Sequence, residues 1–347
     1  MFTDEELERY SRQLVLPRIG REGQLKLKNS RVCIIGVGGL GWLTSLQLAA
    51  MGVGYLRLVD RDIVELSNLQ RQLLFEVDDI NKSKSETAAR RIKRVNPNIH
   101  VDPLMVSINL DNVHDIIRGF DVVVDCLDNF KARMILNYAC VKAGEPLVYA
   151  SAIRLYGAVH TVIPGVSACL ECLYGDVESL EAESCAEAGV LPTILGAVSS
   201  MASQEVLNIL LNGEPALSKS MLVMDFESCE FDKIFLERNP NCRICGVNRV
   251  DLKPTGEIPV ERLCTEGSYM ISPLKPVRLD LKKLEDQIRL KYQVYKTTPV
   301  FIEFYYAPEI TVTLVRSGGI LFKGVSSEEE ARRIYRDLQP LIEASKS

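Results

Sequence analysis

A glycine-rich turn is the first segment of the sequence whose residue types suggest chemistry. The segment GVGGLG follows RVCIIG, an apolar run that predicts a buried strand, and it opens a predicted helix. Glycines let the backbone approach phosphates closely, and the free N–H groups at a helix N-terminus attract anions. We therefore expect a nucleotide to bind at Gly36, Gly38, Gly39 and Gly41.

A carboxylate follows at the spacing expected for ribose binding. Asp60 ends the next predicted strand, about 20 residues on, where its oxygens can accept hydrogen bonds from ribose hydroxyls. The glycine turn and this carboxylate fit a nicotinamide or flavin enzyme as well as an ATP-dependent one. The pair alone does not separate these classes.

The charged residues downstream favour chemistry at a phosphate. The loop DRDIVELSNLQRQ carries Asn68, Arg71 and Gln72, and Lys84 begins the next predicted helix. DCLDN places Asp128 and Asn129 after a later strand. The carboxyl ends of parallel strands face one ligand crevice, so these groups can converge on the glycine turn. Hydride transfer does not need so many charges. Attack on an α-phosphate does, because pyrophosphate must leave and a metal must balance its charge.

Each of these residues also has an ordinary structural reading. Arg71 and Lys84 could be surface charges, and Asp128 could cap a helix. The sequence contains no GxxxxGK[ST] segment, so it is not a P-loop enzyme. We take the joint arrangement, rather than any single residue, as the indication of a catalytic site.

Two CxxC pairs have the spacing of metal ligands. Cys169 and Cys172 form one pair, and Cys242 and Cys245 form the other. Four thiolates suit a tetrahedral zinc ion and leave no open coordination position, which predicts a structural site. The alternative is four unrelated buried thiols.

The order of predicted elements indicates the fold class. Strands and helices alternate from residue 31 to about residue 150, which predicts a doubly wound, Rossmann-like and mostly parallel sheet. An amphipathic N-terminal helix precedes it. From Tyr156 we expect an antiparallel extension with a zinc knuckle. A polar, turn-rich segment at residues 246–256 then divides a large nucleotide-binding domain, 1–248, from a small α/β module, 249–347. We read the module as strand, helix, two or three strands and helix.

Composition excludes several classes. The net charge of −5 argues against a nucleic-acid-binding protein. The N-terminus lacks the apolar core of a signal peptide, and the apolar stretch Thr193–Leu211 contains polar residues and reads as a buried helix. Ten cysteines without a secretory signal suggest free thiols. We expect a cytoplasmic protein that does not bind a membrane.

Several motifs, in order, resemble the ThiF/MoeB/HesA family, whose core is shared with ubiquitin-activating enzymes. They are RYSRQ, GVGGLG, DRDIVELSNLQRQ, the Lys84 helix, DCLDN and the CxxC pairs, and they cover about residues 5–246. The resemblance implies ATP contacts at Gly39, Asp60, Asn68, Arg71 and Lys84, with Mg²⁺ near Asp128. It also implies a homodimer in which Arg12 reaches the phosphates bound by the partner subunit.

The resemblance further implies a reaction and a partner. The enzyme would adenylate the C-terminal glycine of a ubiquitin-like or sulfur-carrier β-grasp protein that ends in Gly-Gly. Cys185 matches the position of a cysteine that accepts the activated carboxyl group in some relatives, as a thioester or a persulfide-linked intermediate. Its neighbours Glu183 and Glu187 disfavour the thiolate.

Three readings remain open from the sequence. The first is the adenylating enzyme, with possible pathways in molybdopterin or thiamine synthesis, transfer-RNA thiolation or protein conjugation. The second is a dinucleotide-dependent oxidoreductase, although no hydride-transfer acid or base is evident. The third is a non-catalytic scaffold that binds the small partner. By analogy with the ubiquitin-fold domain of eukaryotic activating enzymes, the C-terminal module could dock a conjugating partner. A sulfur-donor protein is another partner that the resemblance allows.

Overall fold

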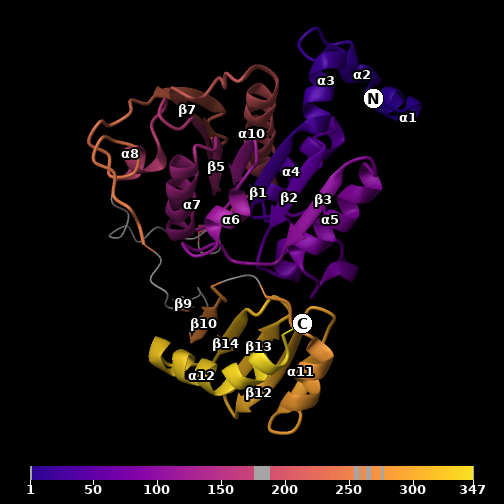
Figure 1. Cartoon of the computed structure of the whole chain (residues 1–347), viewed down its shortest axis with the longest axis vertical. Coiled ribbons are helices and arrows are strands. Elements are labelled where there is room, and N and C mark those ends of the chain that lie inside the picture. Colours follow the sequence, from indigo (N-terminus) through magenta and orange to yellow (C-terminus); the bar gives the residue numbers. More distant parts are fainter. Residues whose placement is uncertain are drawn as a thin grey trace.

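The larger part of the molecule is built on an eight-stranded sheet (Figure 1). The computed structural model describes residues 2–175, 188–253, 258, 260–262, 267–274 and 277–346. Five strands pair in parallel in the order β3-β2-β1-β4-β5. Their bounds are β1 Arg31–Ile35, β2 Tyr55–Val59, β3 His100–Leu104, β4 Val122–Asp125 and β5 Leu147–Ile153. Strand order reverses at β1, so the crevice beside β1 and β4 is a topological switch point.

Helices cover both faces of this sheet, as the alternating strand–helix pattern predicts. Along β1, Val32 and Ile34 face one core layer, while Cys33 and Ile35 face the other. The first layer packs α4 (Gly41–Met51), α5 (Lys84–Val95) and α10 (Pro192–Asn212) against the sheet. The second packs α6 (Val113–Ile117), α7 (Phe130–Ala143) and α8 (Leu170–Tyr174). The predicted doubly wound fold is confirmed.

The N-terminus departs from the prediction of one amphipathic helix. The structure has three short helices, α1 (Asp4–Arg9), α2 (Ser11–Leu14) and α3 (Gly20–Asn29). Pro17 lies between α2 and α3, where its ring and missing N–H are incompatible with a continuous helix. Two 3₁₀ turns, η1 (Leu66–Asn68) and η2 (Val77–Asp79), lie between β2 and α5.

The antiparallel extension also agrees with the sequence. Strands β6 (Tyr156–Val162), β7 (Ser220–Asp225) and β8 (Glu230–Phe235) continue the sheet from β5 by antiparallel pairing. Helix α10 is the one described helix with the length and composition to cross a membrane, and 61% of its apolar window is buried inside the protein. It contacts α4, β4, β5 and β6, as a core helix does.

A second, six-stranded antiparallel sheet follows, in the order β11-β12-β13-β14-β10-β9. Its strands are β9 (Val260–Arg262), β10 (Ser268–Ile271), β11 (Gln293–Thr297), β12 (Phe301–Ala307), β13 (Ile310–Val315) and β14 (Ile320–Lys323). Helices α11 (Leu281–Ile288) and α12 (Glu328–Ala344) pack on it around one core. Four strands, not two or three, separate these helices. The domain boundary at residue 248 stays a prediction.

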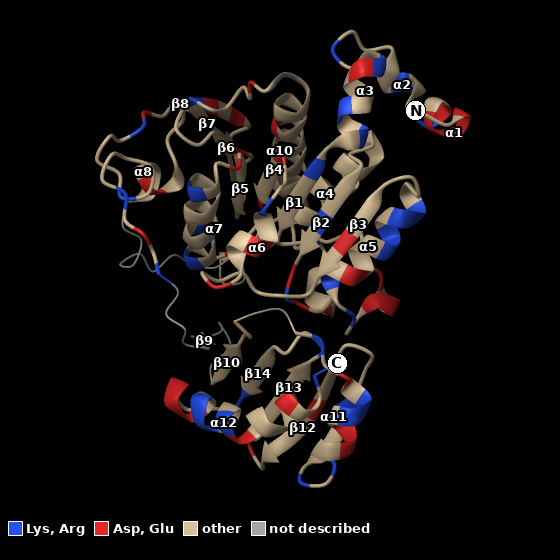
Figure 2. Cartoon of the chain, in the orientation of Figure 1, with Lys and Arg blue, Asp and Glu red and all other residues tan. Residues whose placement is uncertain are grey.

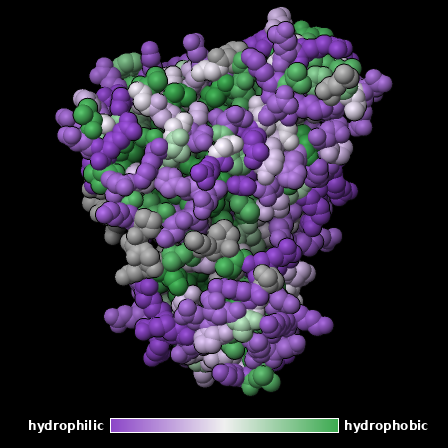
Figure 3. All heavy atoms as spheres, viewed as in Figure 1, coloured by the Kyte–Doolittle hydropathy of each residue, from purple (hydrophilic) through white to green (hydrophobic). Residues whose placement is uncertain are grey.

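The surface is mainly hydrophilic on the face shown in Figure 3, where hydrophobic residues form separate patches.

The C-terminal helix begins as its sequence suggests. Ser327 is the N-cap of α12, and its hydroxyl accepts a hydrogen bond from the Glu330 backbone N–H at 3.2 Å. Three glutamates in the first turn add favourable interactions with the helix dipole.

Candidate active site

A cavity of about 1570 Å³ lies along the carboxyl ends of β1, β2 and β4 and extends beside β5 and β6. It contains most of the residues proposed from the sequence. The predicted residues that line it are Gly36, Gly38, Gly39, Asp60, Asn68, Arg71, Lys84, Asp128 and Asn129. The topology therefore brings together segments that are far apart in the chain, at the switch point of the sheet.

Gly41 has a packing role beside this cavity rather than a place in its lining. A Cβ atom on Gly41 would lie 1.8 Å from the carbonyl oxygen of Gly36. Gly36 itself has a φ of +90°, which is in the left-handed region that side chains disfavour. Both glycines allow the tight passage from β1 into α4. The backbone can then present its N–H groups to a ligand at the helix N-terminus.

Asp60 is held at the end of β2 by backbone donors. Its carboxylate accepts hydrogen bonds from the N–H of Val37 at 2.7 Å and from the N–H of Asp62 at 2.8 Å. Burial raises the pKa of Asp60 to about 6, although the charge of Lys84 opposes this effect. The bond to Val37 ties Asp60 directly to the glycine turn.

Lys84 is a buried cation with a carboxylate partner that the sequence analysis missed. Its side chain is 8% exposed, and Nζ lies 3.1 Å from Oδ2 of Asp62. Burial alone would lower the pKa of Lys84, but Asp62 and Asp60 hold it above its ordinary value, with Asp128 adding to the effect. Lys84 therefore keeps its charge. The signal for Asp62 was its position two residues after Asp60, on the same side of an extended chain.

Asp62 and Lys84 lie on a short two-stranded segment, residues 62–64 and 81–84, which we call the ribbon. Three backbone hydrogen bonds join its two sides: Lys84 N–H to Asp62 O at 3.0 Å, Val64 N–H to Lys82 O at 2.8 Å, and Asn81 N–H to Val64 O at 2.8 Å. The ribbon fixes the backbone at both members of the ion pair. It thereby sets the position of the Lys84 ammonium group.

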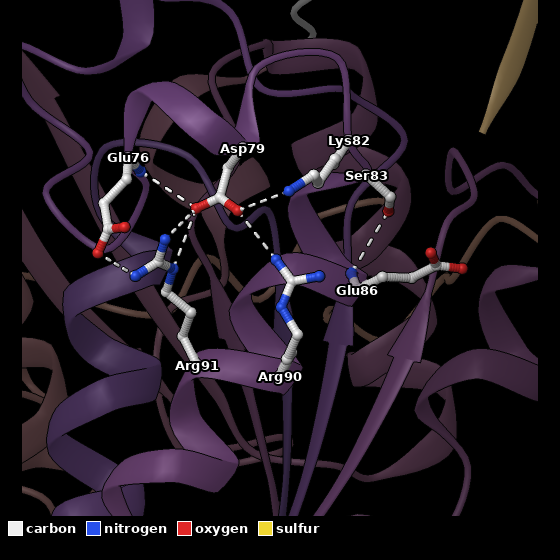
Figure 4. A network of polar contacts seen from close by, with 7 residues as sticks. All are labelled: Glu76, Asp79, Lys82, Ser83, Glu86, Arg90 and Arg91. Atoms are coloured by element: carbon white, nitrogen blue, oxygen red, sulfur yellow. Dashed lines mark hydrogen bonds and ion pairs between the residues drawn. The ribbon is translucent and has the colours of Figure 1, made fainter. Parts of the chain in front are cut away.

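A charged network around Asp79 connects η2 to α5, just before the ribbon closes (Figure 4). The Asp79 side chain is 2% exposed and receives hydrogen bonds from Arg90 at 2.9 Å and from Arg91 Nε at 3.0 Å. The Glu76 N–H donates to it at 3.2 Å. Figure 2 shows that Lys and Arg positions gather on α5, and the side chains of two of these residues, Arg90 and Arg91, bind this buried carboxylate.

We expect Asp79→Asn to destabilise the fold by about 1.5–3 kcal/mol at neutral pH, because charge-assisted hydrogen bonds are lost. Burial alone would raise the pKa of Asp79, but the hydrogen bond from Arg91 lowers it overall. A lowered pKa in the folded state stabilises above the unfolded value, about 3.9, and this contribution is lost as pH falls through the folded pKa. The difference between wild type and variant should therefore shrink in acid.

Urea unfolding at several pH values measures this difference. The matched control is Asp78→Asn, which changes the neighbouring exposed carboxylate. A constant difference from pH 7 to pH 3 for Asp79→Asn would contradict the assigned ion pairs.

The loop with Asn68 and Arg71 is held mainly by its own hydrogen bonds. Asn68 is buried, and its Oδ1 accepts from the Glu65 N–H at 3.1 Å. Arg71 is half-buried and donates from Nη1 to the Ser67 carbonyl at 3.0 Å. Gln72 lines the cavity with a 2% exposed side chain, and its buried Oε1 has no hydrogen-bond partner among the described residues. Gln72 is a second candidate ligand absent from the predicted site.

Asp128 is free of the helix-capping role that was its alternative reading. Asn129 is the N-cap of α7, and its Oδ1 accepts from the Ala132 N–H at 2.9 Å. Asp128 is exposed and lines the cavity. One exposed carboxylate in a cavity beside a glycine turn fits Mg²⁺, which binds through one or two carboxylates together with substrate phosphates.

A buried ion pair supports the turn that carries Asp128. Asp125 is fully buried at the end of β4, and its Oδ2 lies 3.5 Å from Nε of Arg133. The other oxygen of Asp125 accepts from the Leu127 N–H at 3.0 Å, and Arg133 donates to the Leu127 carbonyl. Leu127, the residue before Asp128, is thus held by hydrogen bonds to its backbone N–H and to its carbonyl oxygen.

The four cysteines of the CxxC pairs converge. Their Sγ atoms all lie within 4.8 Å of one another, with separations of 3.9 Å (Cys169–Cys172), 3.7 Å (Cys169–Cys242) and 3.4 Å (Cys172–Cys245). Tetrahedral ligands with Zn–S bonds of about 2.3 Å would lie about 3.8 Å apart. Three of the four are buried, and all are free thiols. The cluster could therefore hold a metal ion.

Comparison with known proteins identifies the family of the chain. The sequence model of the ThiF family matches residues 10–244, about two thirds of the chain. The chain belongs to the ThiF family. It is 38% identical over 247 residues to the SAMP-activating enzyme E1 of Haloferax volcanii, covering 71% of this chain and 91% of that protein. It is 37% identical to the molybdopterin-synthase adenylyltransferase of Salmonella typhimurium, covering 70% and 98%.

The fold has solved relatives as well. A crystal structure of E. coli MccB with MccA-N7isoASN is 27% identical, with a TM-score of 0.62, and covers 69% of this chain and 74% of that one. The ThiF-family match ends at residue 244, before the second sheet.

Two residues that the ThiF-family resemblance singled out are not placed in the cavity. Arg12 lies on α2, exposed, and does not line the cavity as the described residues define it. Cys185 falls at residues 176–187, outside the described part of the chain. The roles of both residues stay predictions.

Proposed function

We propose that this chain is an ATP-dependent adenylyltransferase that activates the C-terminal carboxylate of a small ubiquitin-like or sulfur-carrier protein. The observation that carries the proposal is the buried Lys84–Asp62 pair, which lies with Asp60 and Asp128 beside the glycine turn. The names of the relatives, a SAMP-activating enzyme, a sulfur carrier protein adenylyltransferase and a molybdopterin-synthase adenylyltransferase, support it.

The chemistry is a displacement at the α-phosphorus of ATP. A carboxylate oxygen of the partner's last residue attacks, the bond to the bridging oxygen of pyrophosphate breaks, and an acyl-adenylate and pyrophosphate result. Lys84 and Arg71 supply positive charge to the phosphates as negative charge develops. Mg²⁺ held at Asp128 would neutralise the leaving pyrophosphate. Asp60 would accept hydrogen bonds from the ribose.

The size of the cavity supports a polypeptide substrate. It continues from the glycine turn along β5 and β6 to an aromatic wall of Phe130, Tyr149 and Tyr174. The hydroxyls of Tyr149 and Tyr174 lie 2.8 Å apart, and Phe130 packs edge-on against Tyr174 at 5.2 Å. A narrow, extended tail ending in Gly-Gly would fit beside such a wall, since glycines need no side-chain space.

The proposal extends to the remaining elements of the site. Zn²⁺ is the metal we assign to the cysteine cluster, because four thiolates suit it. Arg12 would act on the phosphates of a partner subunit in a homodimer. Cys185 would accept the activated carboxyl group, and a reductant-sensitive complex that persists in Cys185→Ala would refute this. The free thiols at the described cysteines support a reducing, cytoplasmic setting.

Exchange of labelled pyrophosphate into ATP tests the proposal. We expect exchange only when a β-grasp partner ending in Gly-Gly is present, since the adenylate forms reversibly on that carboxylate. The control is the same partner without its last two residues. Exchange driven by free amino acids, or tighter binding of NAD than of ATP, would contradict the proposed function and favour the oxidoreductase reading or another class. Binding of the partner without any exchange would favour the scaffold.

A further inference from the structure

The second sheet lies against the segments that carry the nucleotide-binding residues. Figure 1 shows it below the larger sheet, near β3 and the start of α5. An apolar cluster joins the two parts: Met105, which follows β3, packs with Val300, Phe301 and Val315 of the second sheet. Ile63 of the ribbon packs against the same cluster.

The position of Ile63 explains why this contact reaches the site. Successive side chains of an extended strand point to opposite sides. Asp62 lines the cavity and binds Lys84, whereas Ile63 faces the second sheet. The ribbon is thus packed between the nucleotide cavity on one side and the C-terminal part of the chain on the other.

Three polar contacts reinforce this packing. Arg316, just after β13, forms an ion pair with Glu86 in the first turn of α5, two residues beyond Lys84. Lys296 of β11 donates to the side-chain oxygen of Asn81 at 3.0 Å. The Ser272 hydroxyl donates to that of Ser107, a residue of the cavity wall, at 2.8 Å.

The backbone is held in place at Arg316, which binds Glu86, and at Asn81, which binds Lys296. The N–H of Arg316 donates to the Val300 carbonyl at 2.7 Å, and its carbonyl accepts from the Leu279 N–H at 2.8 Å. Asn81 has a φ of +69°, in the left-handed region that asparagine tolerates better than most residues. The bond from Lys296 holds the side chain of this turn residue, three positions before Lys84.

We propose that the C-terminal module positions Lys84 for nucleotide binding, with Arg316 and Lys296 as its positioning residues. The inference rests on the proposed function for its kinetic consequence. The contacts described above reach Asn81, Ile63 and Glu86, which are neighbours of Lys84 and Asp62 in the chain. The module fixes the backbone on both sides of the ribbon, and so lowers the cost of holding the Lys84 ammonium group where the phosphates bind.

The first test is Arg316→Gln in the full-length chain, assayed by partner-dependent pyrophosphate exchange. We expect the KM for ATP to rise roughly 2- to 30-fold, the range found for mutations that act through a coupled network. The KM for the partner should stay unchanged. The matched control is Arg333→Gln, which removes a surface ion pair with Glu330 on α12 of the same module.

A charge exchange separates positioning from general stability. Arg316→Glu combined with Glu86→Arg restores an ion pair of reversed polarity and should bring the KM for ATP back toward the wild-type value. Lys296→Gln, which spares Arg316, should raise the KM in the same direction. An unchanged KM in both Arg316→Gln and Lys296→Gln, or a failure of the exchanged pair to recover any of the loss, would overturn the proposal.

Amide hydrogen exchange provides a readout that does not need catalysis. In Arg316→Gln, the ribbon amides of Val64, Asn81 and Lys84 should exchange faster, because their hydrogen bonds open more often. Unchanged protection of these amides would overturn the positioning role even if the enzyme were active. Faster amide exchange in Arg316→Gln, together with no pyrophosphate exchange by the wild-type enzyme, would support the positioning role and contradict the proposed function.

Discussion

Lys84→Ala is expected to lower partner-dependent pyrophosphate exchange by about 100- to 1,000-fold, the usual loss when one fixed donor to developing charge is removed. The side chain is nearly buried in the cavity wall, and water cannot replace a charge held at that position. Removal of the Lys84 ammonium group also leaves the carboxylates of Asp62 and Asp60 without their shared cation. The uncompensated negative charge then repels the phosphates of ATP. Both effects slow formation of the acyl-adenylate.

The control for this variant is two residues away. Lys82→Ala removes a lysine that is 42% exposed and bound to Asp79 at 3.5 Å rather than to the cavity carboxylates. It should keep exchange close to wild type. Equal losses in both variants would mean that ribbon stability, and not the Lys84 charge, sets the rate.

Mixing Lys84→Ala with Arg12→Ala protein should recover activity only if Arg12 serves a partner subunit.

Cys242→Ser is expected to have the largest effect on stability. The substitution replaces one of four converging thiolates and should reduce bound zinc from one equivalent per chain to nearly none. Structural zinc sites bind with apparent free energies of about 10–16 kcal/mol in small peptides, which sets an upper limit for the loss here. Because the rest of the chain has its own cores, we expect a substantially lower melting temperature rather than complete unfolding.

Metal analysis and thermal unfolding check this expectation together. Cys229→Ser is the matched control, since Cys229 is exposed and is not one of the four clustered thiols. The knuckle also contributes Glu171 and Arg243 to the cavity wall, so Cys242→Ser should weaken partner binding as well. Full stability in a metal-free Cys242→Ser protein would contradict a structural zinc site.

Much of the fold was predictable because the pattern is local. The strand–helix alternation, the glycine turn and Asp60 each follow from a few adjacent residues and short-range rules. The convergence of Arg71, Lys84 and Asp128 followed from one topological rule, that the carboxyl ends of parallel strands meet. The four clustered cysteines followed from spacing alone.

What the sequence did not reveal depends on tertiary placement. Asp62 looked like one more loop carboxylate until the ribbon paired it with Lys84 across 22 positions. Gln72 was named with Asn68 and Arg71 in the loop after Asp60, but nothing marked it as a ligand before its burial in the cavity wall was known. Strand β11, QVYKT, alternates half-buried and exposed residues and carries little apolar signal. The contacts of Arg316 with Glu86 and of Lys296 with Asn81 link residues more than 200 positions apart.

The long separation within the cysteine cluster has a consequence for how the protein is made. Cys172 and its ligand partner Cys245 lie 73 residues apart. At ordinary elongation rates of 5–20 residues per second, roughly 4 to 15 seconds pass on the ribosome between the two. The parallel half of the sheet can form in that interval, while the first cysteine pair still lacks its partners. A metal ion held by this cluster would then be taken up late in biogenesis, and cells short of zinc should accumulate chains whose nucleotide half is already folded.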